Sequence, residues 1–376
     1  MKILEIAPFS AGTCGLWARI KSETQLLAKK HDIYVFSSNI KRGSGRPETA
    51  EKYEEINGVK IYRFPVKFHI GENTYFWNFE KEALKLKPDI IITHAYRQFY
   101  SSAALKISKK LKIPCFLVTN APFVELKTRG FCLSMLTYVY DKLVGRYTIN
   151  SYDKVLAITK WELPYLSKIG CKMEKIVYSP NGVPDEFFKI DAKKRNNKIK
   201  KILFLGRIAP IKDIETMIEA IKILRDSGTD IIVELVGPVE DEYGKVLNNI
   251  INKYNLTNIR LLGPVYDLKA KINIIDGADI FILPSKREAM PQALIEAMAR
   301  GKFIIASDTL GSKEIINDGK NGFLFNIGNA KQLSEKIDFV LKNYGKLRIV
   351  ENEAKKTSKQ FAWSDLIKKT EDLCEA

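Results

Sequence analysis

The 376-residue sequence has little of what a membrane-spanning, exported or disulfide-stapled protein needs. It contains no apolar run near the roughly 20 residues that cross a bilayer. Its first residues, MKILEIAPFSAG, lack the apolar length and cleavage site of a signal peptide. Its five cysteines are scattered, and no two of them form a Cys-x-x-Cys pair. This spacing argues against a disulfide framework or a zinc site, so we expect reduced thiols and a cytoplasmic location.

Acidic residues are in short supply relative to basic ones. The chain has 61 Lys and Arg against 44 Asp and Glu, a net charge of +17. Such a surplus attracts nucleic acid, an acidic membrane face or phosphorylated small molecules. The densest basic run, KKRNNKIKK at 193–201, has no aromatic residue to stack on a base, so we interpret it as a solvated linker and expect no nucleic-acid partner. The charge also supports the hypothesis that the protein docks at the anionic inner face of a membrane.

What the sequence does contain is a regular alternation of apolar runs and amphipathic segments. With 376 residues, 45% hydrophobic and 28% charged, it is an ordinary globular chain long enough for two domains. Runs such as KILEIAP, DIYVFSS and PDIIITH precede a linker at 185–200, and KKILFLGR, DIIVELVG and ADIFILP follow it. Nearly all-apolar strands are typical of sheets that helices cover on both faces. The pattern predicts an α/β protein with two Rossmann-like, doubly wound domains facing a central cleft.

Two cations leave the end of the first predicted strand of the second half. Arg207 directly follows KILFLG, and Lys212 comes five residues later in GRIAPIK. Ligands of doubly wound folds bind beyond the carboxyl ends of the strands. The two side chains are therefore candidates to hold phosphate groups.

A second cluster follows the predicted strand ADIFILP. Pro291 suits the first turn of a helix. Glu288 then lies in the loop before this helix and Glu296 roughly one and a half turns inside it. The backbone N–H groups of Ala289 and Met290, with the helix dipole, are candidates for an anion site that fits a diphosphate. The two carboxylates would flank that site and accept hydrogen bonds from the hydroxyl groups of a sugar and a ribose.

These motifs carry a family resemblance. EAMPQALIEAMARG, with seven residues between its glutamates, the pattern GR-x4-K and the segment SPNGV resemble the family-4 retaining glycosyltransferases of GT-B fold. The resemblance extends over nearly the whole chain, from the N-terminal glycine loop to the last Trp-containing helix. It implies an acceptor-side domain over 1–185 that is completed by a C-terminal helix at 358–376. A nucleotide-sugar-binding domain over 186–357 is implied as well.

The resemblance also implies roles for single residues. Arg207 and Lys212 would hold the donor diphosphate. Glu288 would touch the transferred sugar and Glu296 the ribose. The backbone near Val265, in LLGPV, would contact the base.

The first half departs from the family in several places. Gly12 and Gly15 lie in SAGTCGLW, where relatives commonly carry adjacent glycines. The segment reads as a glycine loop near ligand or as a simple turn. His94 follows the strand PDIIIT, and we favour a cleft-facing, catalytic side chain over an interior histidine. Asn120 stands where many relatives have a histidine near the donor sugar, and an amide cannot exchange protons near neutral pH.

The segment 131–147 reads as one helix with an apolar face. We favour packing of that face in the core, with contact to a membrane as the alternative. The residues of the face are Cys132, Met135, Leu136, Val139, Leu143 and Val144.

The sequence therefore predicts a retaining, metal-independent hexosyltransferase. No Asp-x-Asp occurs that would hold a diphosphate-bound metal, so we expect no metal and no cofactor. The substrates would be a UDP- or GDP-sugar and the hydroxyl of a glycan or lipid-linked acceptor. The alternatives are a GT-B epimerase of a UDP-sugar, which the glutamate spacing disfavours, and a basic nucleic-acid-binding protein, which lacks an interleaved basic and aromatic motif.

Overall fold

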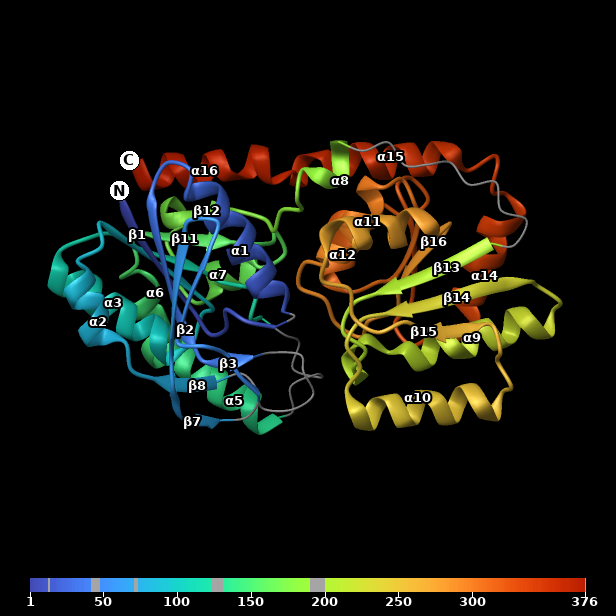
Figure 1. The fold of residues 1–376 in the computed structure, drawn as a ribbon, viewed down its shortest axis with the longest axis horizontal. Coiled ribbons are helices and arrows are strands. Elements are labelled where there is room, and N and C mark those ends of the chain that lie inside the picture. The colour runs from blue at the N-terminus through green and yellow to red at the C-terminus, as the bar shows by residue number, and fades with distance from the viewer. Residues whose placement is uncertain (13, 42–47, 71–73, 124–130, 190–199, 376) are drawn as a thin grey trace. The chain divides into compact units, whose positions relative to one another are not determined.

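The chain folds into two compact units, which Figure 1 shows with their elements labelled. The computed structural model describes residues 1–12, 14–41, 48–70, 74–123, 131–189 and 200–375. Unit 1 comprises the described residues up to Asn181 and those from Leu366 onward, and unit 2 comprises Gly182–Asp365. The boundaries expected from the sequence are after 185 and after 357. Most of the basic run 193–201 lies outside the described residues.

Unit 1 is built on an eight-stranded sheet of order β12-β11-β10-β9-β1-β2-β6-β5. Its strands are β1 (Lys2–Ala7), β2 (Asp32–Ser38), β5 (Tyr53–Ile56), β6 (Val59–Phe64), β9 (Ile90–His94), β10 (Cys115–Val118), β11 (Lys154–Ala157) and β12 (Ile176–Tyr178). All neighbours pair in parallel except β5 and β6, which are antiparallel. The strand order reverses between β1 and β9, so the loops after these two strands flank the switch point of the sheet.

Helices and two small antiparallel sheets complete unit 1. The small sheets pair β3 (Ile40–Lys41) with β4 (Glu48–Thr49) and β7 (Val66–Ile70) with β8 (Thr74–Trp77). The helical elements are α1 (Gly15–Leu27), α2 (Glu80–Leu86), α3 (Phe99–Leu111), α5 (Phe131–Tyr140), the π-helix η1 (Asp141–Gly145), α6 (Arg146–Ile149), α7 (Leu163–Lys168) and the 3₁₀ turn η2 (Met173–Lys175). The last helix, α16 (Trp363–Glu375), begins in unit 2, and most of it belongs to unit 1.

Unit 2 has a six-stranded, all-parallel sheet of order β15-β14-β13-β16-β17-β18. Its strands are β13 (Lys200–Leu205), β14 (Ile231–Val236), β15 (Ile259–Leu261), β16 (Ile280–Leu283), β17 (Phe303–Ser307) and β18 (Phe323–Phe325). Its helical elements are α8 (Glu186–Lys189), η3 (Pro210–Lys212), α9 (Ile214–Asp226), α10 (Asp241–Lys253), α11 (Leu268–Gly277), α12 (Gln292–Ala299), α13 (Leu310–Ile315), α14 (Ala330–Lys342), α15 (Arg348–Ser358) and η4 (Lys359–Phe361). The order of this sheet reverses between β13 and β16.

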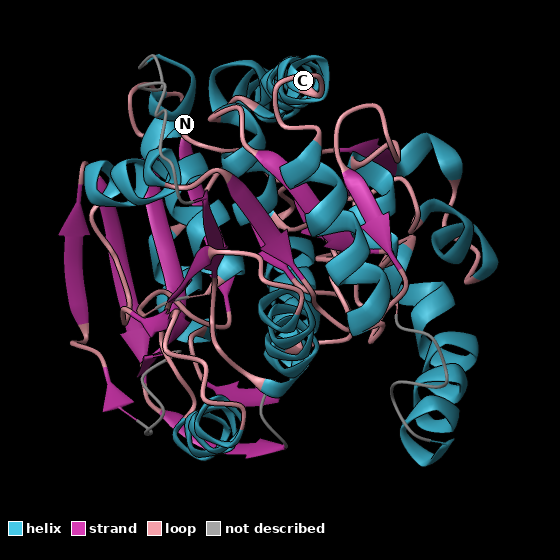
Figure 2. Ribbon diagram, turned by 90° about the vertical axis from the view of Figure 1, so that its right-hand side faces the viewer, coloured by secondary structure: helices cyan, strands magenta, loops and turns pink. Residues whose placement is uncertain are grey.

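The strands are apolar because helices cover them, and Figure 2 shows the strands flanked by helices. In β16 all four residues are buried, and β9 is buried along its whole length. The predicted fold class, two doubly wound α/β domains, is confirmed. Among the described helices, none combines the length and the apolar character that a membrane crossing needs.

One packing prediction from the sequence is wrong. The apolar face within 131–147 was expected in the core, but Met135, Leu136, Val139, Leu143 and Val144 are all exposed. The side chain of Cys132 lies outside the described side chains. Helical periodicity shows which residues share a face, and it does not show whether another element covers that face.

Candidate active site

The carboxyl ends of the unit 2 strands bring three polar residues and the predicted base-contacting loop at Val265 to one edge of the sheet. In the order of the strands, Val265 follows β15, Glu240 follows β14, Arg207 follows β13 and Glu288 follows β16. Arg207 and Glu288 therefore flank the point where the strand order reverses. Open α/β sheets bind their ligands at this point.

Lys212 and Glu288 form a largely buried ion pair at this edge. Lys212 ends η3, and its Nζ atom lies 2.5 Å from Oε1 of Glu288. The same oxygen accepts a hydrogen bond of 2.6 Å from the Ser285 hydroxyl. The backbone N–H of Lys286 donates to the carbonyl of Ile211, which ties the two loops together. Lys212 thus fixes the orientation of Glu288 and also supplies positive charge, a double role that the sequence did not predict.

Arg207 has a more open setting. Its guanidinium donates a 2.6 Å hydrogen bond to Oε1 of Glu240, and both side chains are about a third or more exposed. An exposed ion pair of this kind contributes little to stability. The Arg207 guanidinium can therefore exchange Glu240 for a phosphate at small cost, because a phosphate also accepts charge-assisted hydrogen bonds from a guanidinium.

The helix that the sequence predicts after Glu288 is present as α12. Pro291 precedes its first residue, Gln292, with extended backbone angles, and Glu296 lies inside the helix as predicted. Oε1 of Glu296 is 2.5 Å from Nζ of Lys271 on α11. Oε2 is buried and has no hydrogen-bond partner among the described atoms. A buried carboxylate oxygen of this kind can accept a hydrogen bond from a ligand hydroxyl.

The loop between Glu288 and Pro291 is packed tightly against α13. The backbone N–H of Gly311 donates to the Glu288 carbonyl at 3.2 Å. A β-carbon at Gly311 would lie 2.8 Å from that carbonyl oxygen and even closer to the Ala289 carbonyl oxygen. Only glycine allows this approach of the two backbones. Gly311 was not identified from the sequence, where TLGSKE reads as an ordinary helix start.

We expect Gly311→Ala to displace the Glu288 loop, because the clash is with backbone atoms that have no alternative rotamer. Overpacking of this kind typically costs about 1–3 kcal/mol. The affinity of this edge of the sheet for its ligand should fall at least about tenfold, which ligand-binding measurements and thermal unfolding would show. The matched control is Gly345→Ala, because a β-carbon at Gly345 meets no atom within 4 Å. Wild-type behaviour of Gly311→Ala would contradict the conclusion that close packing of Gly311 positions the Glu288 loop.

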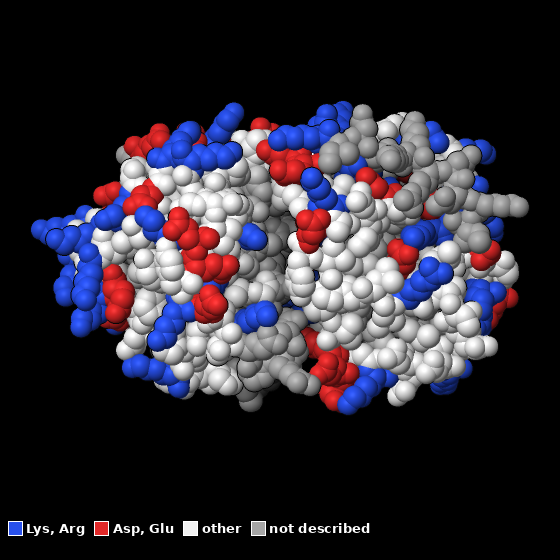
Figure 3. All heavy atoms as spheres, viewed as in Figure 1, with Lys and Arg blue, Asp and Glu red and all other residues white. Residues whose placement is uncertain are grey.

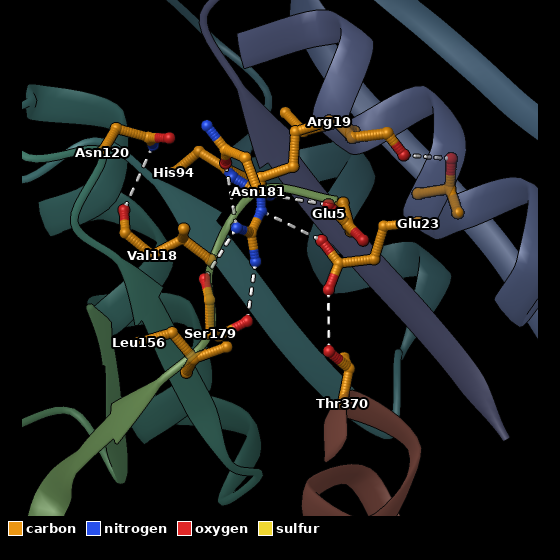
Figure 4. Close-up of polar contacts among 12 residues, drawn as sticks. Glu5, Arg19, Glu23, His94, Val118, Asn120, Leu156, Ser179, Asn181 and Thr370 are labelled. Carbon is orange, nitrogen blue, oxygen red and sulfur yellow. Dashed lines mark hydrogen bonds and ion pairs between the residues drawn. The ribbon is translucent and has the colours of Figure 1, made fainter. Parts of the chain in front are cut away.

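Unit 1 has a buried polar pair, Glu5 and His94, on the two strands that flank its switch point, β1 and β9. His94, the last residue of β9, is fully buried, and its Nε2 lies 2.6 Å from Oε2 of Glu5 on β1 (Figure 4). Burial lowers the pKa of His94 to about 3 and raises the pKa of Glu5 well above its usual value. Burial therefore favours the uncharged form of both side chains. The sequence favoured a cleft-facing His94, and the structure corrects this to an interior histidine.

Arg19 joins this region to the segment SPNGV. Its guanidinium donates to the Ser179 carbonyl at 2.8 Å, to the Ser179 hydroxyl at 2.8 Å and to the Asn181 side chain at 3.1 Å (Figure 4). It also pairs with Glu23, which accepts a 2.8 Å hydrogen bond from Thr370 of α16. Arg19 was not identified from the sequence. It lies on the buried face of α1, where apolar residues are usual, so an arginine within this helix was not expected to be buried.

Strained backbone marks the carboxyl edge of the unit 1 sheet. Ala95 and Arg97 after β9, and Asn120 and Ala121 after β10, have positive φ angles between 46° and 70°. The Asn120 side-chain amide donates to the Val118 carbonyl at 3.3 Å. Strain of this kind clusters at functional sites.

The predicted glycines of the first loop behave differently from each other. Gly12 has a φ of +81°, whereas Gly15 is the first residue of α1. Both are exposed. Gly12, Gly15, His94 and Asn120 belong to unit 1, and the remaining predicted site residues belong to unit 2.

Comparisons with known proteins agree on one class. Residues 18–187 match the model of Glycosyltransferase Family 4, and residues 185–357 match that of Glycosyl transferases group 1. An uncharacterized glycosyltransferase of Methanocaldococcus jannaschii is 28% identical, over 96% of this chain and 94% of its own length. The N,N'-diacetylbacillosaminyl-diphospho-undecaprenol alpha-1,3-N-acetylgalactosaminyltransferase of Campylobacter jejuni is 26% identical, over 59% of each chain. The structure of Anabaena HepE, solved with UDP and glucose, superposes with a TM-score of 0.78 at 15% identity, over 100% of this chain and 99% of HepE.

Proposed function

The chain belongs to the GT-B glycosyltransferases that join a family 4 domain to a group 1 domain, and on this premise we propose that it moves a hexose-like sugar from a nucleotide diphosphate sugar to an acceptor hydroxyl with retention of anomeric configuration. The observation that carries the proposal is the cluster of Arg207, Lys212 and Glu288 beside the switch point of the unit 2 sheet.

The donor binds to unit 2 in this proposal. Arg207 and Lys212 meet the charge of the diphosphate, and that charge grows as the glycosidic bond breaks. Fixed cations therefore stabilise the transition state more than the ground state. Glu288, held by Lys212 and Ser285, aligns the transferred sugar. The structure of HepE with UDP and glucose favours UDP-glucose as the first donor to test.

In this proposal Glu296 binds the ribose of the donor. Its buried oxygen Oε2 has no partner among the described atoms, which supports a hydrogen bond from a ribose hydroxyl. Lys271 holds the other oxygen, so the carboxylate is fixed before the ligand arrives. The loop at Val265 supplies backbone contacts to the base.

The acceptor is proposed to be a glycan or a lipid-linked sugar that binds to unit 1. The name of the Campylobacter jejuni relative specifies a diphospho-undecaprenol acceptor. The positive-φ backbone at Arg97 and Asn120 supports the carboxyl edge of the unit 1 sheet as the acceptor side.

We propose front-face attack as the retaining mechanism. The acceptor oxygen bonds to the anomeric carbon on the face from which the phosphate departs, and its proton passes to the departing phosphate oxygen. Asn120 supports this route, because an amide cannot take the proton near neutral pH. His94 is also unsuited to the task, because it is buried against Glu5. In this mechanism Arg207 and Lys212 supply the charge that a metal ion would otherwise supply.

A donor screen tests this function. UDP-, GDP- and ADP-sugars are offered with simple glycoside acceptors, and nucleotide release and the anomer of the product are measured. We expect one nucleotide series to raise the melting temperature, because it binds only the folded state, and the product to keep the donor's configuration. The same assay in excess EDTA should retain activity. An inverted product, or a free epimerised sugar nucleotide without transfer, would contradict the proposal.

A further inference from the structure

The helical segment from α5 through η1 to α6 exposes a row of large apolar side chains. Met135, Val139, Leu143 and Tyr147 follow one another at a spacing of four residues, which places them on one side of a helix. Leu136, Tyr138 and Val144 widen this row. All seven are between 42% and 72% exposed. We call these seven residues the apolar face.

The opposite side of the segment is fixed to unit 1. Asp141 accepts a 3.0 Å hydrogen bond from the Tyr96 hydroxyl and pairs with Arg97 at 2.5 Å. Gly145 packs so closely against the Tyr96 hydroxyl that a β-carbon there would overlap with it. Ile149 is fully buried. The segment is therefore packed and hydrogen-bonded to the rest of unit 1 along this side.

The charges around the apolar face are positive. Lys142 and Arg146 lie within the segment and are exposed, and the Lys142 ammonium lies 5.1 Å from the Tyr138 ring centroid. Exposed Lys168 follows on α7. The acid of the segment, Asp141, is engaged by Arg97 and is largely buried. Large apolar and aromatic side chains with lysine and arginine beside them are typical of helices that lie in a membrane interface.

We propose that the apolar face docks the protein on an anionic lipid surface. The flanking cations would meet lipid phosphates, and the seven apolar and aromatic side chains would enter the interface. A second copy of the chain is a poorer occupant, because two such faces in contact would bring Lys142 and Arg146 of one copy against those of the other. The inference goes beyond the proposed sugar transfer and does not depend on it.

The position of the face links it to the carboxyl edge of the unit 1 sheet. Its anchor, Arg97, lies three residues after the end of β9, in the strained stretch of that edge. In Figure 1, α5 lies at the lower border of unit 1, near the small sheet of β7 and β8. If the acceptor is lipid-linked, which is one of the two kinds in the proposed function, docking here would present unit 1 to the membrane that carries it.

The test is co-sedimentation with vesicles of phosphatidylcholine containing 30% phosphatidylglycerol, compared with pure phosphatidylcholine, at low salt. We expect the wild-type protein to bind the anionic vesicles at least about tenfold more tightly than the neutral ones. Leu136→Ser with Leu143→Ser, and separately Lys142→Glu with Arg146→Glu, should each weaken binding at least about tenfold. Circular dichroism and thermal unfolding check that the variants are folded.

Two matched controls separate this face from general adsorption. Ile349→Ser removes an equally exposed apolar side chain of α15 in unit 2. Lys109→Glu with Lys110→Glu reverses charge at the end of α3, in the basic border of α2 and α3 that Figure 3 shows. Both controls should bind within about twofold of wild type, as expected for surface sites away from the docking face.

Several results would overturn the proposal. They are absence of wild-type binding, normal binding of the α5–α6 variants, or loss of binding only in the α3 variant. Analytical ultracentrifugation provides another, because a dimer abolished by Leu136→Ser with Leu143→Ser would assign the face to a second copy. Stabilisation by nucleotide should be unchanged in every variant, so failure of docking is distinguishable from failure of the donor site.

Discussion

Replacing Lys212 with alanine should lower kcat by about 10²–10³-fold without unfolding the protein, which is the loss seen when one fixed donor of a transition-state charge is removed. Two effects combine. The cation that faces the departing diphosphate is lost, and among the described side chains Glu288 keeps the hydroxyl of Ser285 alone as a partner. Arg207→Ala should cause a loss of similar size, although its partner Glu240 is exposed and needs no replacement.

Donor-dependent steady-state kinetics and thermal unfolding check this expectation. Lys222→Ala is the matched control, because Lys222 is also paired with a carboxylate, Asp226, and lies on α9 at an exposed position. It should leave kcat unchanged. Full activity in both Lys212→Ala and Arg207→Ala would exclude this edge of the unit 2 sheet as the donor site.

The second large effect should separate the two glutamates by kinetic signature. Glu288 aligns a sugar whose anomeric carbon gains positive character, so its interaction strengthens in the transition state. Glu296 contacts a ribose that does not change, and an interaction that is equal in both states affects KM alone. We expect Glu288→Gln mainly to lower kcat and Glu296→Gln mainly to raise the donor KM.

The size of the two losses does not distinguish them, because a charge-assisted hydrogen bond is worth about 1.5–3 kcal/mol in either role. The two roles are distinguished by whether the loss appears in kcat or in the donor KM. Glutamine is nearly the same size as glutamate, so packing in α12 is preserved and stability should change little. A fall of kcat in Glu296→Gln at unchanged donor affinity would reverse or refute the assignment.

The strands that frame the proposed donor site could be predicted from the sequence. Apolar strands and the residues that follow them define the carboxyl edge of a parallel sheet, so Arg207 and Glu288 could be assigned to that edge without a structure. Proline before a run of helix formers likewise located the start of α12. These are short-range signals, and they do not depend on how distant segments pack.

The partners of the site residues could not be predicted in the same way. Glu240, Lys271 and Ser285 are ordinary polar residues in the sequence, and they become partners only through the pairing of separate elements. Gly311 matters because another backbone approaches it, and no sequence pattern encodes that approach. His94 ends a strand, which is a common position for an active-site residue. Its partner in the interior, Glu5, is 89 positions away in the sequence, so the sequence does not show that the histidine is buried.

The apolar segment 131–147 shows the remaining limit. Its periodicity is the same whether the face meets the core, a membrane or another protein. Only the absence of covering residues in the described structure separates these cases, and that is a tertiary property.

The placement of α16 has a consequence for how the protein is made. A ribosome releases residues 182–365 before the last residues of unit 1, so unit 2 can reach its native fold while unit 1 still lacks a helix. Thr370, which donates a hydrogen bond to Glu23 beside Arg19, is translated after the whole of unit 2. The buried polar centre of unit 1 is therefore completed only after all of unit 2 has been translated, although most of unit 1 is translated before unit 2.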